Sequence, residues 1–133
     1  MSFTNKTIDL GFVHMDLSKH CVVGTVEEGV LIELEHIAAL HEVFAEYYSE
    51  GNFGYIDNRI KQYAINLNPE LYNTRYPKMV GIAIVCYTEN CIKNANFEKT
   101  FYNWPFGVFR SLEEAQQWIA KLIAEEEEKK AGL

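Results

Sequence analysis

The sequence has few cysteines, and nothing in their spacing indicates that they pair. It has three, Cys21, Cys86 and Cys91, an odd number whose spacings match neither a disulfide framework nor the C-x-x-C pair of a zinc site. Cys21 and Cys86 lie in apolar runs, which favours buried and inert side chains. We therefore expect three reduced thiols.

Long apolar runs are missing as well. No segment approaches the roughly 20 apolar residues that a membrane-spanning helix needs. The start of the chain, Met1 to Lys6, is polar and lacks the apolar core of a signal peptide. These absences predict a soluble, cytoplasmic protein without membrane insertion.

Motifs that bind phosphate or metal, or that carry hydrolysis, are also absent. The chain has no G-x-G-x-x-G, G-x-x-x-x-G-K, H-E-x-x-H or G-x-S-x-G pattern. His36 and His41 fall about 140° apart around one predicted helix, so they cannot share a metal without a third element. Because no nucleophile–base pair, metal spacing or phosphate loop can be assembled from the sequence, we expect no metal site and no enzymatic activity.

Basic residues are outnumbered by acidic ones. Twelve Lys and Arg stand against nineteen Asp and Glu, a net charge of −7. Nucleic acid is therefore not an expected partner, because its phosphates are neutralised by Lys and Arg. Part of the charge is local: Glu125 to Glu128 precede Lys129 and Lys130 at helical spacing, a pattern typical of a solvated helix end.

The residues that are present suffice for one domain. The 133 residues are 48% hydrophobic and 14% aromatic, enough to bury a core without disulfides. We expect a single domain over residues 1–133, with an ordered core from about residue 7 to about residue 124.

The first half of the chain predicts a hairpin and then a helix. Alternation at Ile8, Leu10 and Phe12 indicates an edge strand, and after a polar turn at residues 16–19 a second strand over residues 21–26 pairs back on it. An amphipathic helix then runs to a C′ glycine, Gly51. Its apolar positions follow three-four spacing: Leu34, Ile37, Leu40, His41, Phe44, Tyr47 and Tyr48.

The second half alternates strands and helices. Residues 79–87 are apolar at both odd and even positions, as in a parallel strand covered on both faces. The remaining predicted elements are a strand at 53–56, a helix from Asn68 that Pro77 closes, a helix at 89–102 capped by Thr88, a strand at 105–109, and a final helix opened by a Ser111–Glu114 capping box.

This order predicts an α/β fold. We expect a five-stranded, mostly parallel sheet with an antiparallel N-terminal edge strand and four helices. The expected core includes His41, Phe44, Ile84, Val108 and Trp118.

One polar segment follows a predicted parallel strand, where ligands bind in open α/β sheets. Its candidate residues for binding a ligand or a partner are Asp57, Asn58, Arg59, Tyr63 and Asn66. Arg59 is suited to a carboxylate or phosphate, and Asp57 to orienting it or acting as an acid or base. The alternative is that Asp57 and Asn58 close a turn while Arg59 pairs with a surface acid.

Three segments together with the element order resemble the STAS or SpoIIAA-like domains of bacteria. They are residues 26–30 (VEEGV), 55–59 (YIDNR) and 106–115 (FGVFRSLEEA), and the similarity extends from about residue 7 to about residue 124. The resemblance implies a STAS-like domain without a cofactor that acts as a regulatory or protein-interaction module.

In some members of that family, a serine in an Asp-x-Ser-Gly motif is phosphorylated by a partner kinase. Asp57 matches the aspartate of that motif, whereas Arg59 occupies the serine position and no serine or threonine follows before Thr74. Other SpoIIAA-like proteins look related to carriers of small molecules or lipids.

Two binding functions therefore stay open, a carrier of a small ligand and a protein-interaction module. An enzyme that uses Asp57 and Arg59 is a third, less favoured alternative. A carrier of a small anionic or apolar ligand should have a closed pocket lined by aromatic residues such as Tyr63, Tyr72, Phe97 and Phe101. A module that binds a regulatory protein should instead have a solid core and an exposed patch.

Overall fold

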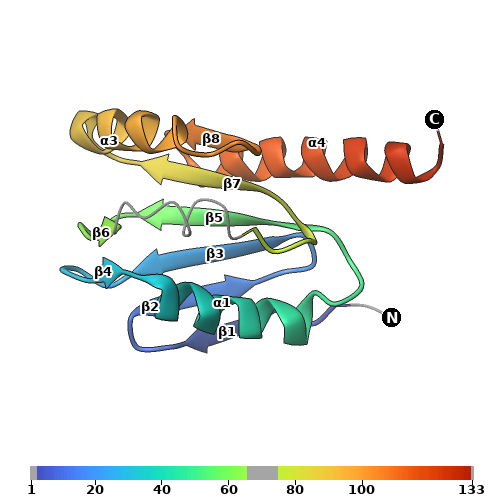
Figure 1. Ribbon diagram of the computed structural model, residues 1–133, viewed down its shortest axis with the longest axis horizontal. Helices are drawn as coiled ribbons and strands as arrows, with labels where there is room; N and C mark the ends of the chain where they lie inside the picture. The colour runs from blue at the N-terminus through green and yellow to red at the C-terminus, as the bar shows by residue number, and fades with distance from the viewer. Residues whose placement is uncertain (1–2, 66–74, 133) are drawn as a thin grey trace.

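A computed structural model describes residues 3–65 and 75–132 of the chain. Within them a six-stranded sheet has the order β1-β2-β3-β5-β7-β8, and three helices accompany it (Figure 1). The strands are β1 (Lys6–Asp9), β2 (Val13–Leu17), β3 (Cys21–Val26), β5 (Phe53–Arg59), β7 (Met79–Cys86) and β8 (Phe106–Phe109). The helices are α1 (Leu34–Tyr47), α3 (Glu89–Lys99) and α4 (Leu112–Lys130).

The sheet is mixed, as the sequence predicts, but it has more strands than expected. The pairs β3-β5, β5-β7 and β7-β8 are parallel, whereas β1-β2 and β2-β3 are antiparallel. A separate two-stranded sheet joins β4 (Leu31–Ile32) to β6 (Ala64–Ile65). The prediction of an α/β fold is confirmed, and the prediction of five strands is wrong.

The missed strand of the main sheet is β2. Val13 and Met15 are fully buried while His14 between them is exposed, the alternation of a strand with one covered face. The turn expected at residues 16–19 is wrong in its first half, because Asp16 and Leu17 pair with β3. The antiparallel edge therefore contains two strands.

The chain turns earlier than expected, between β1 and β2. Gly11 has a φ of 89°, which a residue without a Cβ adopts without strain. Its backbone N–H donates to Asp9 Oδ1 at 2.8 Å. Leu10 and Phe12, which were expected to continue the first strand, belong to this turn.

The strand expected at residues 79–87 is confirmed as β7, which pairs with a parallel strand on each side. Seven of its eight residues are buried. The two caps predicted nearby are present, since Thr88 Oγ1 accepts from Cys91 N at 3.1 Å and Ser111 Oγ accepts from Glu114 N at 3.2 Å.

The amphipathic helix is confirmed as α1, with a different ending. It stops at Tyr47, and Gly51 does not have the positive φ of a C′ glycine. Tyr48 instead turns into the core, where its hydroxyl donates to Ser18 O at 2.6 Å and its ring stacks on Phe53. This anchor holds the end of α1 against the sheet.

The helix expected from Asn68 to Pro77 falls mainly on residues 66–74, which lie outside the part of the chain that the structure describes. Pro77 itself lies in a turn just before β7.

The helices cover both faces of the sheet. In β5, Tyr55 packs in the cluster that α1 completes, whereas the next residue, Ile56, packs against α4. Ile84 of β7 lies on the Tyr55 side and packs with Ala95 of α3. Thus α1 and α3 share one face and α4 covers the other. In Figure 1, α1 lies over the β1–β3 part of the sheet, and α4 packs against β5, β7 and β8.

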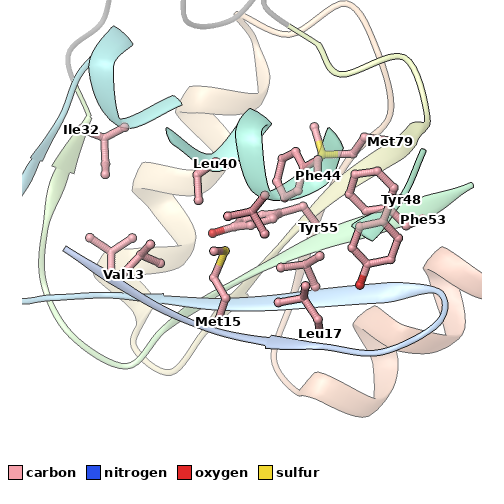
Figure 2. Close-up of a cluster of buried hydrophobic side chains, with 13 residues drawn as sticks. Val13, Met15, Leu17, Ile32, Leu40, Phe44, Tyr48, Phe53, Tyr55 and Met79 are labelled. Carbon is pink, nitrogen blue, oxygen red and sulfur yellow. The ribbon is translucent and has the colours of Figure 1, made fainter. Parts of the chain in front are cut away.

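The largest core cluster lies beneath α1 (Figure 2). It joins Val13, Met15, Leu17, Leu40, Phe44, Tyr48, Phe53, Tyr55 and Met79, each at most 9% exposed. Of the predicted core residues, Phe44 and Ile84 are fully buried. His41, Val108 and Trp118 are partly buried at the margins of the core.

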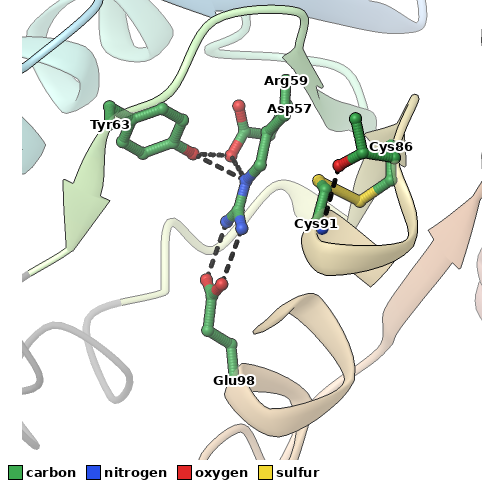
Figure 3. Close-up of polar contacts among 7 residues, drawn as sticks. Asp57, Arg59, Tyr63, Cys86, Cys91 and Glu98 are labelled. Carbon is green, nitrogen blue, oxygen red and sulfur yellow. Dashed lines mark hydrogen bonds and ion pairs between the residues drawn. A yellow bond between two sulfur atoms is a disulfide. The ribbon is translucent and has the colours of Figure 1, made fainter. Parts of the chain in front are cut away.

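The expectation of three reduced thiols is wrong for two of them. Cys86 at the end of β7 and Cys91 in the first turn of α3 form a disulfide (Figure 3). Cys21 is free and buried, as expected, and burial raises the pKa of its thiol to about 11. Because disulfides are rare in the reducing cytosol, this pair gives no support to the cytoplasmic location expected from the sequence.

No helix within residues 3–65 and 75–132 is both long and apolar enough to cross a membrane.

Candidate functional site

The first three candidate residues lie at the carboxyl end of β5, where the sequence places them. They are the last residues of the strand itself, so Asp57 and Asn58 do not close a turn. By the alternation of a strand, Asp57 and Arg59 point to the face shared by α1 and α3, and Asn58 points to the other. Asn58 Oδ1 accepts from the Tyr87 hydroxyl at 2.6 Å.

Arg59 is held by two carboxylates of its own chain (Figure 3). Its Nη1 and Nη2 donate to the two carboxylate oxygens of Glu98 on α3, at 2.6 and 2.7 Å. Its Nε donates to Asp57 Oδ2 at 3.0 Å. The side chains of Arg59 and Glu98 are 11% exposed and that of Asp57 is 6% exposed, so this is a buried ion-pair network and not a surface pair.

Tyr63 completes the network from the loop after β5. Its hydroxyl accepts from Arg59 Nε at 3.0 Å and donates to Asp57 Oδ2, a contact drawn in Figure 3. Burial first, and then the nearby Asp57 charge, raise the pKa of Tyr63 well above its usual value. The phenol therefore stays protonated and acts as a donor.

The charge of Arg59 is stabilised by these neighbours. Burial by itself lowers the pKa of Arg59, but the charge of Asp57 and the hydrogen bonds to Glu98 outweigh it and raise the pKa above its ordinary value. The cluster thus contains one guanidinium and two carboxylates.

One atom of the network has no partner. Asp57 Oδ1 is buried and makes no hydrogen bond with any residue in the ranges 3–65 and 75–132. Asp57 as a whole is only 4% exposed. A buried carboxylate oxygen without a donor is unfavourable, so this atom has room for a hydrogen bond from a water molecule or another donor.

Asp57 and Tyr63 also line a pocket between α1 and the sheet. Its volume is about 90 Å³, room for about three water molecules. The apolar part of the wall comes from both layers: Ile37, Leu40 and Phe44 of α1, and Val26, Met79 and Ile82 of the sheet. The pocket is therefore mainly apolar, with a carboxylate on its wall.

His41 of α1 also lines this pocket. Its ring contacts those of Phe44 and Tyr76, and burial lowers the pKa of the imidazole below 6.5. At neutral pH His41 is uncharged and adds no positive charge to the pocket.

The aromatic residues expected around a carrier pocket are only partly the observed ones. Tyr63 lines it. Phe97 of α3 is 56% exposed, Phe101 in the turn after α3 is 41% exposed, and Tyr72 lies outside the described ranges. Phe44, Tyr55 and Tyr102 contribute the other aromatic rings. Asn66, the remaining candidate, also lies outside those ranges.

A second, polar cleft opens at the carboxyl ends of β5 and β7. It has a volume of about 320 Å³ and is bordered by residues 59–63, by Tyr87 and Thr88, and by Asn90 and Asn94 of α3. Arg59 and Tyr63 are the residues that border this cleft and also belong to the buried network.

Sequence reasoning missed Glu98. A weak signal exists, since Cys91, Ala95 and Glu98 follow helical spacing and place the carboxylate on the inner face of α3. The pairing itself spans 39 residues and depends on the sheet that brings β5 beside β7 and its following helix. In the part of the chain that the structure describes, no group of three or more His, Cys, Asp or Glu is arranged to hold a metal.

Comparison of the chain with protein-family models, with curated proteins and with solved structures gives no match. The function proposed below therefore depends on the geometry of the site.

Proposed function

We propose that this protein is a non-enzymatic binding domain for a small, mainly apolar molecule, held in the pocket between α1 and the sheet. The observation that supports it most is an apolar cavity that is left beside a buried, unpartnered carboxylate oxygen of Asp57. A largely apolar pocket with a few convergent polar groups is typical of ligand sites.

The position of the pocket supports the same proposal. It adjoins the largest core cluster, where protein interiors are otherwise closely packed. The resemblance to STAS or SpoIIAA-like domains, some of which look related to carriers, is compatible with this function and stays a proposal.

A protein-interaction module is the second candidate, and exposed side chains favour it. Ile60 and Tyr87 are 58% and 52% exposed and both border the polar cleft at the strand ends. An enzyme built on Asp57 and Arg59 is less favoured, because the guanidinium is already bound by Glu98.

Filling the pocket tests the carrier function. Ile37→Phe should place a larger side chain in the cavity, and Leu34→Phe on the exposed part of the same helix is the matched control. A neutral apolar probe of five heavy atoms, methyl propyl ether, should raise the melting temperature of the parent and of the control by several degrees at ten times its Kd.

Ile37→Phe should melt close to the parent and respond little to the probe. If the probe stabilises none of the three proteins, or all three equally, the pocket is not a binding site. Native mass spectrometry of the freshly purified protein then shows whether a small molecule or a protein partner accompanies it.

A further inference from the structure

We propose that the pocket ligand carries an amine, whose ammonium group pairs with the Asp57 carboxylate while its apolar chain fills the space between α1 and the sheet. This inference deepens the proposed function and rests on it. It replaces the anionic ligand that the sequence suggested for Arg59.

The first support is the unused acceptor capacity of Asp57. Its Oδ2 accepts from Arg59 Nε and from the Tyr63 hydroxyl, whereas Oδ1 has no donor within the described part of the chain. A carboxylate oxygen accepts hydrogen bonds and cannot donate them, so the missing partner must be a donor. An ammonium group offers three N–H donors and a charge that strengthens each bond.

The second support is the charge balance of the network. Asp57 and Glu98 bring two negative charges against the single positive charge of Arg59. Tyr63 is a neutral phenol in this setting. A cationic ligand would balance the cluster, whereas a carboxylate or phosphate in the pocket would lie beside the like charge of the Asp57 carboxylate.

The hydrogen bonds of Arg59 also disfavour an anionic ligand. Both of its terminal nitrogens are engaged by Glu98 in a two-pronged contact (Figure 3). An anion could use this guanidinium only by displacing a buried carboxylate of the protein itself. None of the pocket-lining residues that the structure describes is Lys or Arg, and His41 is neutral at pH 7.

The apolar side chains of the pocket wall suit the apolar chain of such an amine. The aliphatic side chains accommodate an alkyl chain, and the rings of Phe44, Tyr55, Tyr63 and Tyr102 offer aromatic surface of the kind that attracts cations. A volume of about 90 Å³ limits the buried part of the ligand to a few heavy atoms.

Three probes of similar size test the inference on the unaltered protein: n-butylamine, methyl propyl ether and butyrate, titrated by calorimetry at pH 7. The amine should bind at least tenfold more tightly than the ether, and butyrate more weakly than either. If none of the three binds, the proposed function itself fails. If the ether binds as well as the amine, the pocket function stands and the amine inference is overturned.

Butyrate as the tightest ligand would also overturn the inference, and would restore the anion site first expected at Arg59.

Asp57→Asn should reduce the preference for the amine over the ether from at least tenfold to about onefold, measured as the ratio of the two affinities in the same variant. Glu98→Gln is the matched control, because it removes the same charge from the network at a residue that does not line the pocket. The control should keep most of the preference; an equal loss in both variants would contradict a direct contact with Asp57. Because the ligand series uses the parent protein, it decides the question even where a variant does not fold.

Discussion

At the scale of single residues, the structure changes the role of Arg59. The sequence suggests a side chain that meets a ligand or a surface acid, whereas the observed guanidinium lies between Asp57 and Glu98, both buried. Buried ion pairs contribute little when whole, because desolvation offsets their attraction, but they are costly to break. Removal of Arg59 should therefore destabilise the protein as well as change the site.

Arg59→Ala should lower the free energy of unfolding by about 3–5 kcal/mol, because two carboxylates would lose their buried counter-ion. Urea denaturation measures this loss. Lys61→Ala is the control, since Lys61 pairs with Glu27 at the surface, where both side chains are more than 40% exposed, and should cost less than about 1 kcal/mol. Similar small losses in both variants would show that Arg59 is not buried in the way described.

At the scale of elements, close contacts fix how α4 sits on the sheet. Gly54 of β5 faces Ile119 of α4, and a Cβ at this glycine would lie 2.5 Å from a methyl carbon of Ile119. The helix can approach the strand only because this position has no side chain. The disulfide between Cys86 and Cys91 fixes a second pair of neighbouring elements, β7 and α3, by a covalent bond.

Gly54→Ala should destabilise the protein by about 1–3 kcal/mol, because the added methyl group forces α4 away from β5. Gly51→Ala provides the control: nothing lies within 4 Å of its Cβ position and its φ is not positive, so the change should stay within about 0.5 kcal/mol. Thermal unfolding of the two variants makes the comparison. A Gly54→Ala protein as stable as the parent would rule out the close packing.

Reduction of the disulfide should lower stability by about 2 kcal/mol, the value expected for a link that closes a short loop. The loop spans a sequence separation of five. Melting with and without a phosphine reductant measures the effect, and Cys91→Ala should be insensitive to the reductant. Thiol titration of the denatured protein should find one free thiol, Cys21, before reduction. Three thiols at that stage would show that the bond is absent.

At the scale of the whole molecule, β5 connects the two sides of the fold. Tyr55 contributes to the cluster under α1 and Ile56 to the cluster under α4, so neither cluster can lose its order without affecting the strand that both use. The antiparallel β1-β2 edge is joined to the parallel part through the β3-β5 pairing. This shared strand favours unfolding as one unit.

We therefore expect a single two-state transition. The two tryptophans report on different sides, because Trp104 packs against the cluster under α1 and Trp118 against the cluster under α4. In Trp104→Phe and in Trp118→Phe, the unfolding transition followed by the fluorescence of the remaining tryptophan should coincide with the transition followed by far-ultraviolet circular dichroism of the same variant. Transitions that separate in either variant would indicate two independently unfolding parts.

Much of the fold is predictable from local sequence, because backbone geometry determines side-chain periodicity. The apolar run of β7, the helical spacing of α1 and the caps at Thr88 and Ser111 are all visible within a few residues. The same reasoning failed at β2. Its alternation is as clear as that of β1, but residues 16–19 also suit a turn, and only the pairing with β3 decides between them.

The candidate site divides in the same way. The sequence alone placed Asp57 and Arg59 after the carboxyl end of a buried strand. The structure extends that strand to Arg59, so that the two side chains point to the same face. Only the tertiary structure decided that Glu98 binds Arg59, that Asp57 Oδ1 stays without a donor beside an apolar pocket, and that Cys86 meets Cys91. The reason is physical: an apolar run and the polar residues after it are visible in the local sequence, whereas partners and cavities depend on the sheet order and helix positions that bring distant residues together.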